Sequence, residues 1–426
     1  MRELVQNHTI RFTDGSSAVI KKELGRGGQG IVYLVDHDGC DMAFKWYTCD
    51  VSDGFYDNLE SNIKAGSPAS MFLWPKKIST KENGSFGYLM DLRPSNYHDF
   101  SRFLLAKCRF KSVYAMTVAA MEICEGFKSL HAKGLSYQDL NDGNFFIDPN
   151  TGHVLICDND NVVPFGSTSG IHGKARYMAP EVVSGEKNPN AHSDKFSMAV
   201  ILFMLFYMNH PFEGQRVLAC PAMTDDYIKK FYGSDMVFIY SEEDDRNRPV
   251  SNVHTNVYRR WPLFPDILKD TFIKEFSREK LYDGPTRRLT DLQWQNIITS
   301  VRDSLAICPH CMQETFVNAE KGQIICQECG KEIEKMGILR LDKKRKIVLT
   351  LGKKIYIDRD EKMDAEVVRG PQDKDNLYIK NLSSSIWRVT TPSGKLKEVA
   401  PGGLMPANKG LKIDFVSFNK SGEIIE

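Results

Sequence analysis

The stretch LHAKGLSYQDLNDGNFFID, residues 130–148, decides the fold. Before it, apolar residues recur at helical spacing from Val113 to Leu130, which predicts a helix packed on the core. In the loop after that helix, Asp139 and Asn144 lie five residues apart. One loop of this kind can aim a carboxylate at a nucleophile and an amide at a metal ion. The alternative is a polar surface loop with an Asx turn.

A glycine-rich stretch near the N-terminus points to the same chemistry. In LGRGGQGIVY, residues 24–33, Gly25, Gly27 and Gly30 have GxGxxG spacing. Glycines let backbone N–H groups approach phosphate oxygens, although any tight hairpin can be rich in glycine. The loop lies between strand-like runs (AVIKKEL, GIVYLVD), which disfavours a Rossmann fingerprint. Lys45 follows in the next strand-like run, MAFKWY; a lone strand lysine is usually a solvated surface residue.

In this order, the glycine loop, the strand lysine and the loop at 130–148 resemble the motifs of protein kinases. The resemblance covers about 300 residues. It implies an α+β, two-lobed kinase fold over residues 1–303, with an N-lobe of about 1–92 and a C-lobe of about 93–303. It also implies an ATP-dependent serine/threonine protein kinase, a phosphotransferase that acts on protein substrates.

Each site residue follows from its place in a matching motif. Asp139 falls on the aspartate that orients the substrate hydroxyl and accepts its proton, and Lys45 on the lysine that binds the α/β-phosphates. Asn144 and Asp158, the latter in VLICDND, fall on the ligands of Mg²⁺ (or Mn²⁺). The implied ATP-binding set is Gly25, Gly27, Gly28, Gly30, Val32, Lys45, Glu60, Met90, Asp91, Leu92, Arg93, Asn144 and Asp158.

Several members of that set have more specific expected roles. In the family the lysine pairs with a glutamate on the following helix, for which Glu60 is the first choice and Asp57 the second. Either acid could equally be a solvated helix residue. Val32 could cover an adenine face, and Met90 would be the gatekeeper before the adenine hinge.

Other motifs are structural. In GKARYMAPEVV, Glu181 is expected to pair with Arg288, and Asp194 to brace the catalytic loop. The longest apolar run, Phe196–Met208, is too short to span a bilayer and predicts a buried core helix. Trp294 fits the end of the lobe.

The loops also depart from the family pattern. Tyr137 and Gln138 replace the usual His-Arg pair, and that arginine normally docks a phosphorylated activation loop. We therefore expect activity that is not strictly switched by activation-loop phosphorylation, although Ser167, Thr168 and Ser169 could still be modified. Residues 158–160 read Asp-Asn-Asp where Asp-Phe-Gly is usual, so the apolar switch residue is missing.

A departure in the activation segment could compensate for one in the catalytic loop. Asn141 stands where serine/threonine kinases keep a lysine beside the γ-phosphate, and Lys174 stands where a threonine is usual. Our hypothesis is that Lys174 is a catalytic residue that reaches Asp139 and the γ-phosphate. The alternative is a solvated lysine on a mobile loop.

Four of the ten cysteines form two CxxC pairs, Cys308/Cys311 and Cys326/Cys329. Two such turns can close a tetrahedron of thiolates around Zn²⁺, so residues 304–336 are predicted to be a structural zinc ribbon. A redox pair is the alternative. The remaining cysteines are scattered singly, which suits a reducing cytoplasm better than a disulfide framework.

After the ribbon, residues 337–426 alternate short β-like runs with turn signals and predict a small all-β sandwich. LYIKNLSSSIWRVTTPSG and LKIDFVSF resemble a forkhead-associated (FHA) domain, but this segment contains no histidine, so phosphopeptide recognition is not expected. This segment could be a docking module or a structural cap, and the sequence leaves both alternatives open. The whole architecture resembles bacterial eukaryote-like kinases of tellurium-resistance systems, which implies a von Willebrand A-type protein and a cognate phosphatase as partners.

Composition limits other functions. The formal charge of +1 argues against a general polyanion binder, so no nucleic-acid partner is expected. The N-terminus lacks the order of a signal peptide, and a cytoplasmic protein without a membrane partner is expected. A rival function is a nucleotide-binding pseudokinase scaffold that acts through its β tail, and a third is transfer of another group such as AMP or phosphorylation of a small molecule.

Overall fold

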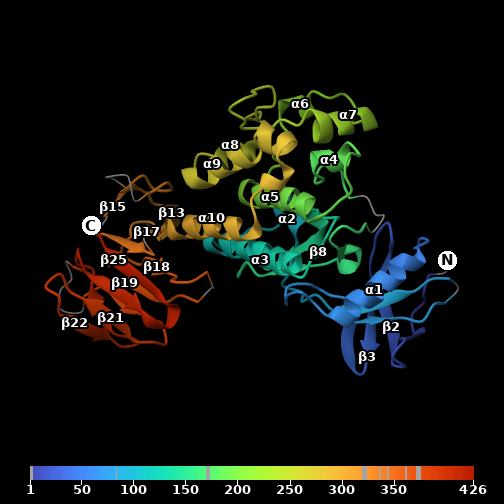
Figure 1. Cartoon of the computed structure of the whole chain (residues 1–426), viewed down its shortest axis with the longest axis horizontal. Helices are drawn as coiled ribbons and strands as arrows, with labels where there is room; N and C mark the ends of the chain where they lie inside the picture. The colour runs from blue at the N-terminus through green and yellow to red at the C-terminus, as the bar shows by residue number, and fades with distance from the viewer. Residues whose placement is uncertain are drawn as a thin grey trace. The chain divides into compact units, whose positions relative to one another are not determined.

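The computed structural model describes residues 3–82, 84–168, 173–318, 324–334, 337–342, 345–359, 362–370 and 376–426. The chain forms two compact units, and its helices and strands are labelled in Figure 1. The first comprises Met1–Lys111, Ala119–His254 and Ile273–Leu292, and the second Ser112–Val118, Thr255–Phe272 and Gln293–Glu426. Ser169, named above as a modifiable residue, lies outside the described residues. The predicted boundaries at 303 and 336 stay predictions.

The first unit begins with an antiparallel sheet in the order β1-β2-β3-β4-β6-β5. Its strands are β1 (Thr9–Arg11), β2 (Ser17–Arg26), β3 (Gly30–His37), β4 (Cys40–Tyr47), β5 (Lys77–Ile78) and β6 (Gly87–Asp91). At the start of β3 a Cβ on Gly30 would lie 2.1 Å from the carbonyl oxygen of Trp46, so only glycine fits there. Helix α1 (Asp53–Ala65) shares a core with β4 and β6 through Leu59, Tyr47 and Tyr88.

The rest of the first unit is mostly helical. Its helices are α2 (Phe100–Leu104), α3 (Val113–Ala132, whose first turns belong to the second unit), α4 (Pro180–Val183), α5 (Ala191–Tyr207), α6 (Gln215–Leu218) and α7 (Asp225–Lys229). Short strands and turns are β7 (His98–Asp99), β8 (Leu135–Ser136), η1 (Asp142–Asn144), β9 (Phe145–Ile147), β10 (Val154–Ile156), η2 (Asn159–Asn161), β11 (Val163–Pro164), η3 (Lys230–Ser234), η4 (Glu279–Asp283) and η5 (Pro285–Arg287). No helix in the described part of the chain is long and apolar enough to cross a bilayer.

Two structural predictions are confirmed in this unit. Every residue of α5 from Phe196 to Tyr207 is buried, so the long apolar run is a core helix. Its N-cap, Asn190, accepts hydrogen bonds from the backbone N–H groups of His192 and Ser193. Arg288 pairs with Glu181 through two parallel hydrogen bonds of 2.8 Å each.

The second unit contains two hairpins and a sandwich. After α8 (Thr255–Arg260), α9 (Asp266–Glu275) and α10 (Asp291–Asp303), the hairpins pair β12 (Leu305–Ile307) with β13 (Glu314–Phe316) and β14 (Ile324–Ile325) with β15 (Glu332–Ile333). Two antiparallel sheets follow, β17-β16-β25-β24-β21-β22 and β18-β19-β20-β23. Their strands are β16 (Ile338–Leu341), β17 (Arg345–Val348), β18 (Lys354–Ile355), β19 (Ala365–Arg369), β20 (Leu377–Asn381), β21 (Trp387–Thr390), β22 (Leu396–Val399), β23 (Leu404–Pro406), β24 (Lys412–Phe415) and β25 (Lys420–Ile424), with one turn, η6 (Val416–Phe418).

One apolar core joins the two sheets. It includes Leu341 and Ile424 from the larger sheet, Val367 and Ile379 from the smaller one, and Trp387 against Phe415 at a ring distance of 5.2 Å. The all-β character expected for residues 337–426 is therefore present.

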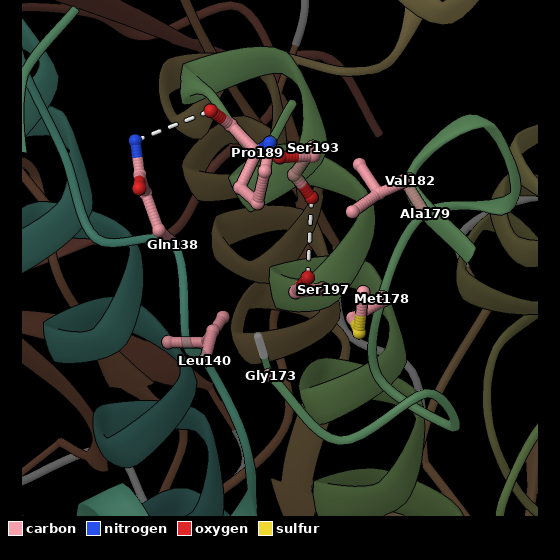
Figure 2. A pocket seen from close by; sticks show the side chains of 9 residues that line it. All are labelled: Gln138, Leu140, Gly173, Met178, Ala179, Val182, Pro189, Ser193 and Ser197. Atoms are coloured by element: carbon pink, nitrogen blue, oxygen red, sulfur yellow. Dashed lines mark hydrogen bonds between the residues drawn. The ribbon is translucent and has the colours of Figure 1, made fainter. Parts of the chain in front are cut away.

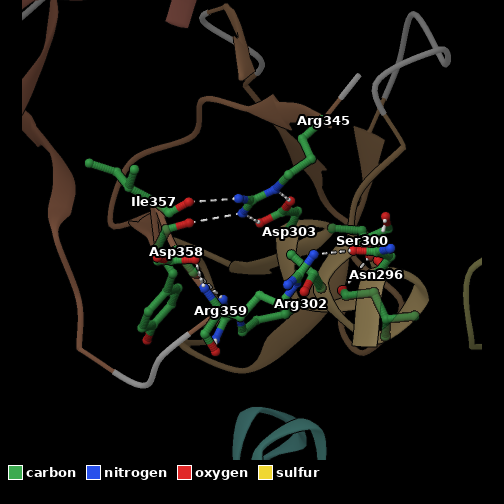
Figure 3. A network of polar contacts seen from close by, with 12 residues as sticks. Asn296, Ser300, Arg302, Asp303, Arg345, Ile357, Asp358 and Arg359 are labelled. Carbon is green, nitrogen blue, oxygen red and sulfur yellow. Dashed lines mark hydrogen bonds and ion pairs between the residues drawn. The ribbon is translucent and has the colours of Figure 1, made fainter. Parts of the chain in front are cut away.

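The C-terminal end of α10 is bonded to the sandwich (Figure 3). Arg345 donates two hydrogen bonds to Asp303, with Nε–Oδ2 and Nη2–Oδ1 distances of 2.7 and 2.9 Å. It also donates to the carbonyl oxygens of Tyr356 and Ile357. Lys353, fully buried, donates to the carbonyl oxygens of Asp303 and Leu305. Burial lowers the pKa of Lys353 to about 8, despite the nearby charge of Asp303.

A second group of contacts lies beside this pair. The Arg302 guanidinium lies 4.5 Å from the centre of the Tyr356 ring and donates to the carbonyl oxygen of Asp358 at 2.8 Å. Tyr356 also stacks on Tyr114 of α3, with ring centres 5.2 Å apart. Glu314 of β13 accepts the backbone N–H of Tyr114 at 3.3 Å, at the helix N-terminus, where a carboxylate is favoured.

We expect Arg345→Met to lower the free energy of unfolding by about 3–5 kcal/mol, because it leaves Asp303 as a buried charge without its partner. Chemical denaturation of the full chain measures this. Arg359→Met is the matched control: Arg359 is exposed and bonds Asn296, so its loss should change stability little. Identical unfolding curves for Arg345→Met and wild type would contradict the assignment.

Candidate active site

The loop at 135–144 is held by one buried carboxylate. Asp194, 2% exposed at the start of α5, accepts the backbone N–H of Tyr137 at 2.7 Å and that of Gln138 at 3.0 Å. Gln138 has a φ of 70°, a region that non-glycine residues seldom occupy. The predicted bracing role of Asp194 is confirmed, because these two bonds fix the turn that presents Asp139.

A histidine balances the charge of Asp194. His131, on α3, lies 3.4 Å from Asp194 through Nε2 and 2.9 Å from Asp291 through Nδ1. Burial alone would lower its pKa, but the hydrogen bonds and charges of the two carboxylates outweigh that effect and raise the pKa of His131 to about 9. His131 is therefore protonated at neutral pH and shares its charge between two acids.

Asn141 links three parts of the loop. Its backbone N–H donates to Asn144 Oδ1 at 2.6 Å, and its side-chain oxygen accepts the N–H of Gly143 at 3.0 Å. Its amide nitrogen donates to Asp139 Oδ1 at 3.2 Å. Asn141 thus replaces a charged lysine with a buried neutral group that positions both Asp139 and Asn144.

Lys174 reaches this loop from the activation segment. Its Nζ lies 2.9 Å from Asn141 Oδ1 and 3.8 Å from Asp142 Oδ1, while the side chain stays 60% exposed. Lys174 is therefore one hydrogen-bonded group away from Asp139, through Asn141. Lys174 therefore brings a positive charge close to Asn141, the position at which the sequence lacks the usual lysine.

The Asp139 carboxylate is poised to accept a proton. Burial raises its pKa to about 6; the hydrogen bond from Asn141 and the charge of Lys174 oppose this, while the charge of Asp158 adds to it. A carboxylate with a pKa near 6 is deprotonated at pH 7 yet more basic than an ordinary aspartate.

Lys45 is buried on β4 and has three oxygen partners. Its Nζ lies 2.8 Å from Asp160 Oδ2, 3.3 Å from Asp158 Oδ1 and 3.2 Å from Gln29 Oε1. Burial disfavours the charged ammonium, but the charges of Asp160 and Asp158 outweigh it, and the pKa of Lys45 is raised. Lys45 therefore stays protonated, and the glycine loop reaches it through Gln29.

The expected pair between Lys45 and Glu60 is not formed in this structure. Glu60 lies 3.1 Å from Lys64, one helical turn along α1, and is 41% exposed. Asp57, the second choice, is exposed on the same helix. The buried residues of α1 are Phe55, Leu59 and Asn62, so the face turned to the core has no carboxylate. Helical periodicity could have revealed this, since neither acid falls on the apolar stripe.

The glycine loop and the expected adenine site have contrasting packing. A Cβ on Gly25, Gly27 or Gly28 would meet nothing within 4 Å among the described atoms, so internal packing does not demand glycine there. Val32, Met90 and Leu92 belong to one apolar cluster with Ala43, Phe146 and Cys157. Asp91 pairs with Lys76 at 2.5 Å, and Arg93 lies over the Phe146 ring at 4.4 Å. The open glycines and the apolar wall suit phosphates and a flat base, respectively.

The residues expected to hold Mg²⁺ offer the oxygen donors that this ion prefers. Asp158 has a left-handed backbone (φ 55°) and a carboxylate that is 47% exposed. Asn144 Oδ1 accepts one hydrogen bond, from Asn141, and retains a second lone pair. Because the charge of Asp158 raises the pKa of Asp139, a cation here would relieve the repulsion between them. The donor set therefore fits a divalent cation.

A small cavity adjoins the loop beside Asp139 (Figure 2). Its lining residues are Gln138, Leu140, Gly173, Met178, Ala179, Val182, Pro189, Ser193 and Ser197. Gly173, one of these lining residues, lies close to the catalytic loop, because a Cβ there would be 3.0 Å from Asp139 Oδ1.

The Gln138 amide donates to the carbonyl oxygens of Ser167 at 2.7 Å and Pro189 at 3.2 Å. A neutral side chain thus joins the catalytic loop to the activation segment.

The four paired cysteines lie together in the second unit. The sulfur atoms of Cys308 and Cys329 are 3.7 Å apart, as are those of Cys311 and Cys326. All four lie within 4.8 Å of one another. Four thiolates at about 2.3 Å from one Zn²⁺ in a tetrahedron would be separated by about 3.8 Å, so the cluster fits that ion.

The two cysteine turns have the same backbone design. In each, the N–H of the residue four positions on donates to the first cysteine's carbonyl oxygen, Met312 to Cys308 at 2.9 Å and Gly330 to Cys326 at 3.0 Å. Both donors have positive φ, 59° and 69°. The two turns therefore present their cysteine pairs in the same way.

Comparison with known proteins finds a family for the part of the chain that contains the loop at 135–144. Residues 18–299, more than half of the chain, match the model of the protein kinase domain family. The chain is 31% identical over 104 residues to a probable serine/threonine-protein kinase PknB of Corynebacterium glutamicum, covering 23% of this chain and 16% of that one.

Other relatives are eukaryotic. The chain is 36% identical over 103 residues to a putative protein kinase C delta type homolog of Drosophila melanogaster, covering 22% of this chain and 14% of that protein. It is 23% identical over 294 residues to CBL-interacting protein kinase 28 of Oryza sativa, covering 63% and 65%. The chain thus spans less than two thirds of the length of each of these relatives.

Proposed function

This chain belongs to the protein kinase domain family, and on that premise we propose that it transfers the γ-phosphate of ATP to serine or threonine hydroxyls of protein substrates. The observation that carries the proposal is the convergence of Asp139, Lys45 and Asp158. The charge of Asp158 raises the pKa of Asp139, and Asp158 Oδ1 lies 3.3 Å from Lys45 Nζ. Asn144, one hydrogen bond from Asn141, completes the set.

Each residue has a role in this proposal. ATP supplies the phosphoryl group, and Mg²⁺ (or Mn²⁺) bound by Asp158 and Asn144 would offset its charge. Asp139 orients the substrate hydroxyl and accepts its proton, which its pKa of about 6 suits. Lys45 contacts the phosphates, the glycine loop covers them, and the apolar residues around Met90 enclose the base, while backbone groups from Asp91 to Arg93 bind its edge.

We also propose that activation-segment phosphorylation does not strictly switch this site. The segment is tied to the catalytic loop by the neutral Gln138 amide, through Ser167 and Pro189, in the place where a phosphate-docking arginine is usual. A tie of this kind requires no added charge. The missing phenylalanine at position 159, where Asn159 is buried and bonds the carbonyl oxygens of Leu73 and Ile156, supports the same inference.

Radiolabelled ATP and mass spectrometry of the full chain with a generic protein substrate test the activity. We expect phosphorylated serine or threonine with wild type and none with Asp139→Asn, which keeps the shape of the side chain but loses the base. Tight ATP binding without transfer would instead indicate the pseudokinase scaffold. The added mass of a nucleotidyl group, or transfer to small molecules alone, would overturn the assignment to protein phosphorylation.

Lys174 is proposed to supply the charge that Asn141 lacks. Its charge lowers the pKa of Asp139, so Lys174→Ala should move the acidic limb of kcat/KM, expected near pH 6, to higher pH. Activity falls as pH drops through this limb, because the base must be deprotonated. We also expect kcat to fall about 10- to 100-fold. Pre-steady-state and pH-dependent assays measure both.

Lys187→Ala is the matched control for Lys174, because Lys187 is an exposed lysine further along the chain, beyond α4. It should leave the limb and kcat unchanged. If Lys174→Ala behaves as this control does, Lys174 is a solvated surface residue.

We propose that the four cysteines hold one structural Zn²⁺. The sulfur–sulfur separations of 3.7 Å and the matching turns support this, and all four ligand positions are occupied by protein. The nearby Glu314 bonds the N-terminus of α3, so the ribbon would also fix that helix end.

Metal analysis of purified protein should find about one zinc per chain. Cys326→Ser should lose it and lower the unfolding temperature, because metal binding is coupled to folding. Cys220→Ser, a single cysteine outside the cluster, is the control and should retain the metal. Full zinc content in Cys326→Ser would contradict the four-cysteine site.

The FHA-like character of the sandwich, the von Willebrand A-type and phosphatase partners and the link with tellurium resistance are proposals that rest on resemblance. The sandwich supports a structural or docking role rather than phosphopeptide binding. Asn381, at the end of β20, and Ser383 and Ser385, which follow it, bond one another, and Ser383 also accepts the indole N–H of Trp387 at 3.1 Å.

A further inference from the structure

Lys45 needs a compensating carboxylate that α1 does not provide. Lys45 is 5% exposed, and a buried charge without a partner is strongly unfavourable. The acids of α1 are directed elsewhere: Glu60 pairs with Lys64, and Asp53 with Lys81 at 2.9 Å. Helix α1 instead contributes two amides, since Asn58 and Asn62 both donate to the Val162 carbonyl oxygen at 2.8 Å.

Asp160 occupies the place next to Lys45. It lies in η2, two residues after Asp158, and its side chain is fully buried. Its Oδ2 accepts from Lys45 Nζ at 2.8 Å and from the Tyr47 hydroxyl at 2.5 Å. Lys45 and Tyr47 are two residues apart on β4, so they project from the same face of that strand. One carboxylate oxygen therefore ties two side chains of β4 to the segment that carries Asp158.

We propose that Asp160 is the positioning residue that holds Lys45 for phosphate binding, in place of the glutamate of the following helix. This inference rests on the proposed kinase function. Asp158 cannot serve alone, because it lies 3.3 Å from Lys45, is half exposed, and is the residue assigned to the divalent cation. Asp160 makes the shorter bond, is inaccessible to solvent, and is oriented by Tyr47, so it keeps Lys45 in place while Asp158 is engaged elsewhere.

This arrangement changes what sets the geometry of the site. The cation ligand and the lysine partner are separated by one residue, so one short turn determines both positions. The α1 helix is tied to the same region through Val162 rather than through an ion pair. Assembly of the lysine pair therefore does not require α1 to bring in a carboxylate.

The test compares full-length Asp160→Asn with Glu60→Gln, the matched control, since each replaces one carboxylate with its amide. Two quantities are measured: kcat and KM for ATP with casein as substrate, and the affinities for ATP and adenosine by competition against a fluorescent nucleotide. Asp160→Asn should lower kcat/KM about 100-fold and largely remove the preference for ATP over adenosine, with adenosine affinity unchanged. Glu60→Gln should stay within about twofold of wild type in both.

The comparison of ATP with adenosine separates positioning from general damage, because a disordered site would lose affinity for both ligands. Partial recovery of the ATP preference in Asp160→Glu would support the inference. It is overturned if Asp160→Asn retains the wild-type preference, or if Glu60→Gln loses it. Should Asp160→Asn unfold, Tyr47→Phe removes only the hydroxyl that orients Asp160, and a severalfold weaker ATP preference is expected; an unchanged preference would overturn the inference.

Failure of the proposed function gives a different result. If wild type binds ATP but transfers no phosphate, the kinase assignment fails, while the nucleotide competition still decides the role of Asp160. If wild type transfers phosphate and Asp160→Asn does so equally well, the kinase assignment stands and Asp160 is not the positioning residue.

Discussion

The active loop depends on the buried carboxylate of Asp194. A left-handed conformation such as that of Gln138 costs about 1–2 kcal/mol, whereas a hydrogen bond to a charged group contributes about 1.5–3 kcal/mol. The two bonds that Asp194 accepts therefore outweigh the strain and make the turn before Asp139 the stable one. His131 makes this possible, because its protonated ring, shared with Asp291, compensates a charge that burial would otherwise make unfavourable.

Periodicity predicted much of the fold. The helical spacing before residue 130 corresponds to α3, the long apolar run to α5, and the runs around the glycine loop to β2, β3 and β4. In the tail, β16, β22, β23 and β25 lie outside the β-like runs expected from the sequence, and β22 and β25 show why. Three of the four residues of β22 are exposed, so it lacks an alternating pattern. In the sequence, Gly422 looks like a turn residue and hides strand β25. In the structure it lies within that strand, where a Cβ would be only 3.0 Å from the side chain of Leu339.

Site residues could be predicted from the sequence where a motif fixes their position along the chain. The prediction failed where the folded packing decides which residues meet. Asp139, Asn144 and Asp158 lie on loops whose spacing carries the prediction, although their catalytic roles stay proposals. The partner of Lys45 was sought on α1 because of chain order, but the helix turns Phe55, Leu59 and Asn62 inward instead. Asp160 was noted only as a replaced glycine; that an acidic residue there is fully buried beside Lys45 depends on the folded packing of β4 against η2.

The contacts at the end of α10 bear on where this chain can be divided. In sequence, residue 303 looks like the end of one domain, because the cysteine segment and the β tail follow. The Asp303 carboxylate nevertheless pairs with the guanidinium of Arg345, and the last carbonyl group of the helix, that of Asp303, accepts a hydrogen bond from Lys353. A chain shortened at this point would lose the guanidinium partner of Asp303 and the lysine donor at the helix end, and would expose the surface that they cover. The sandwich is thus part of the folding unit of the helix that precedes it, and the smallest stable fragment that includes α10 extends into the tail.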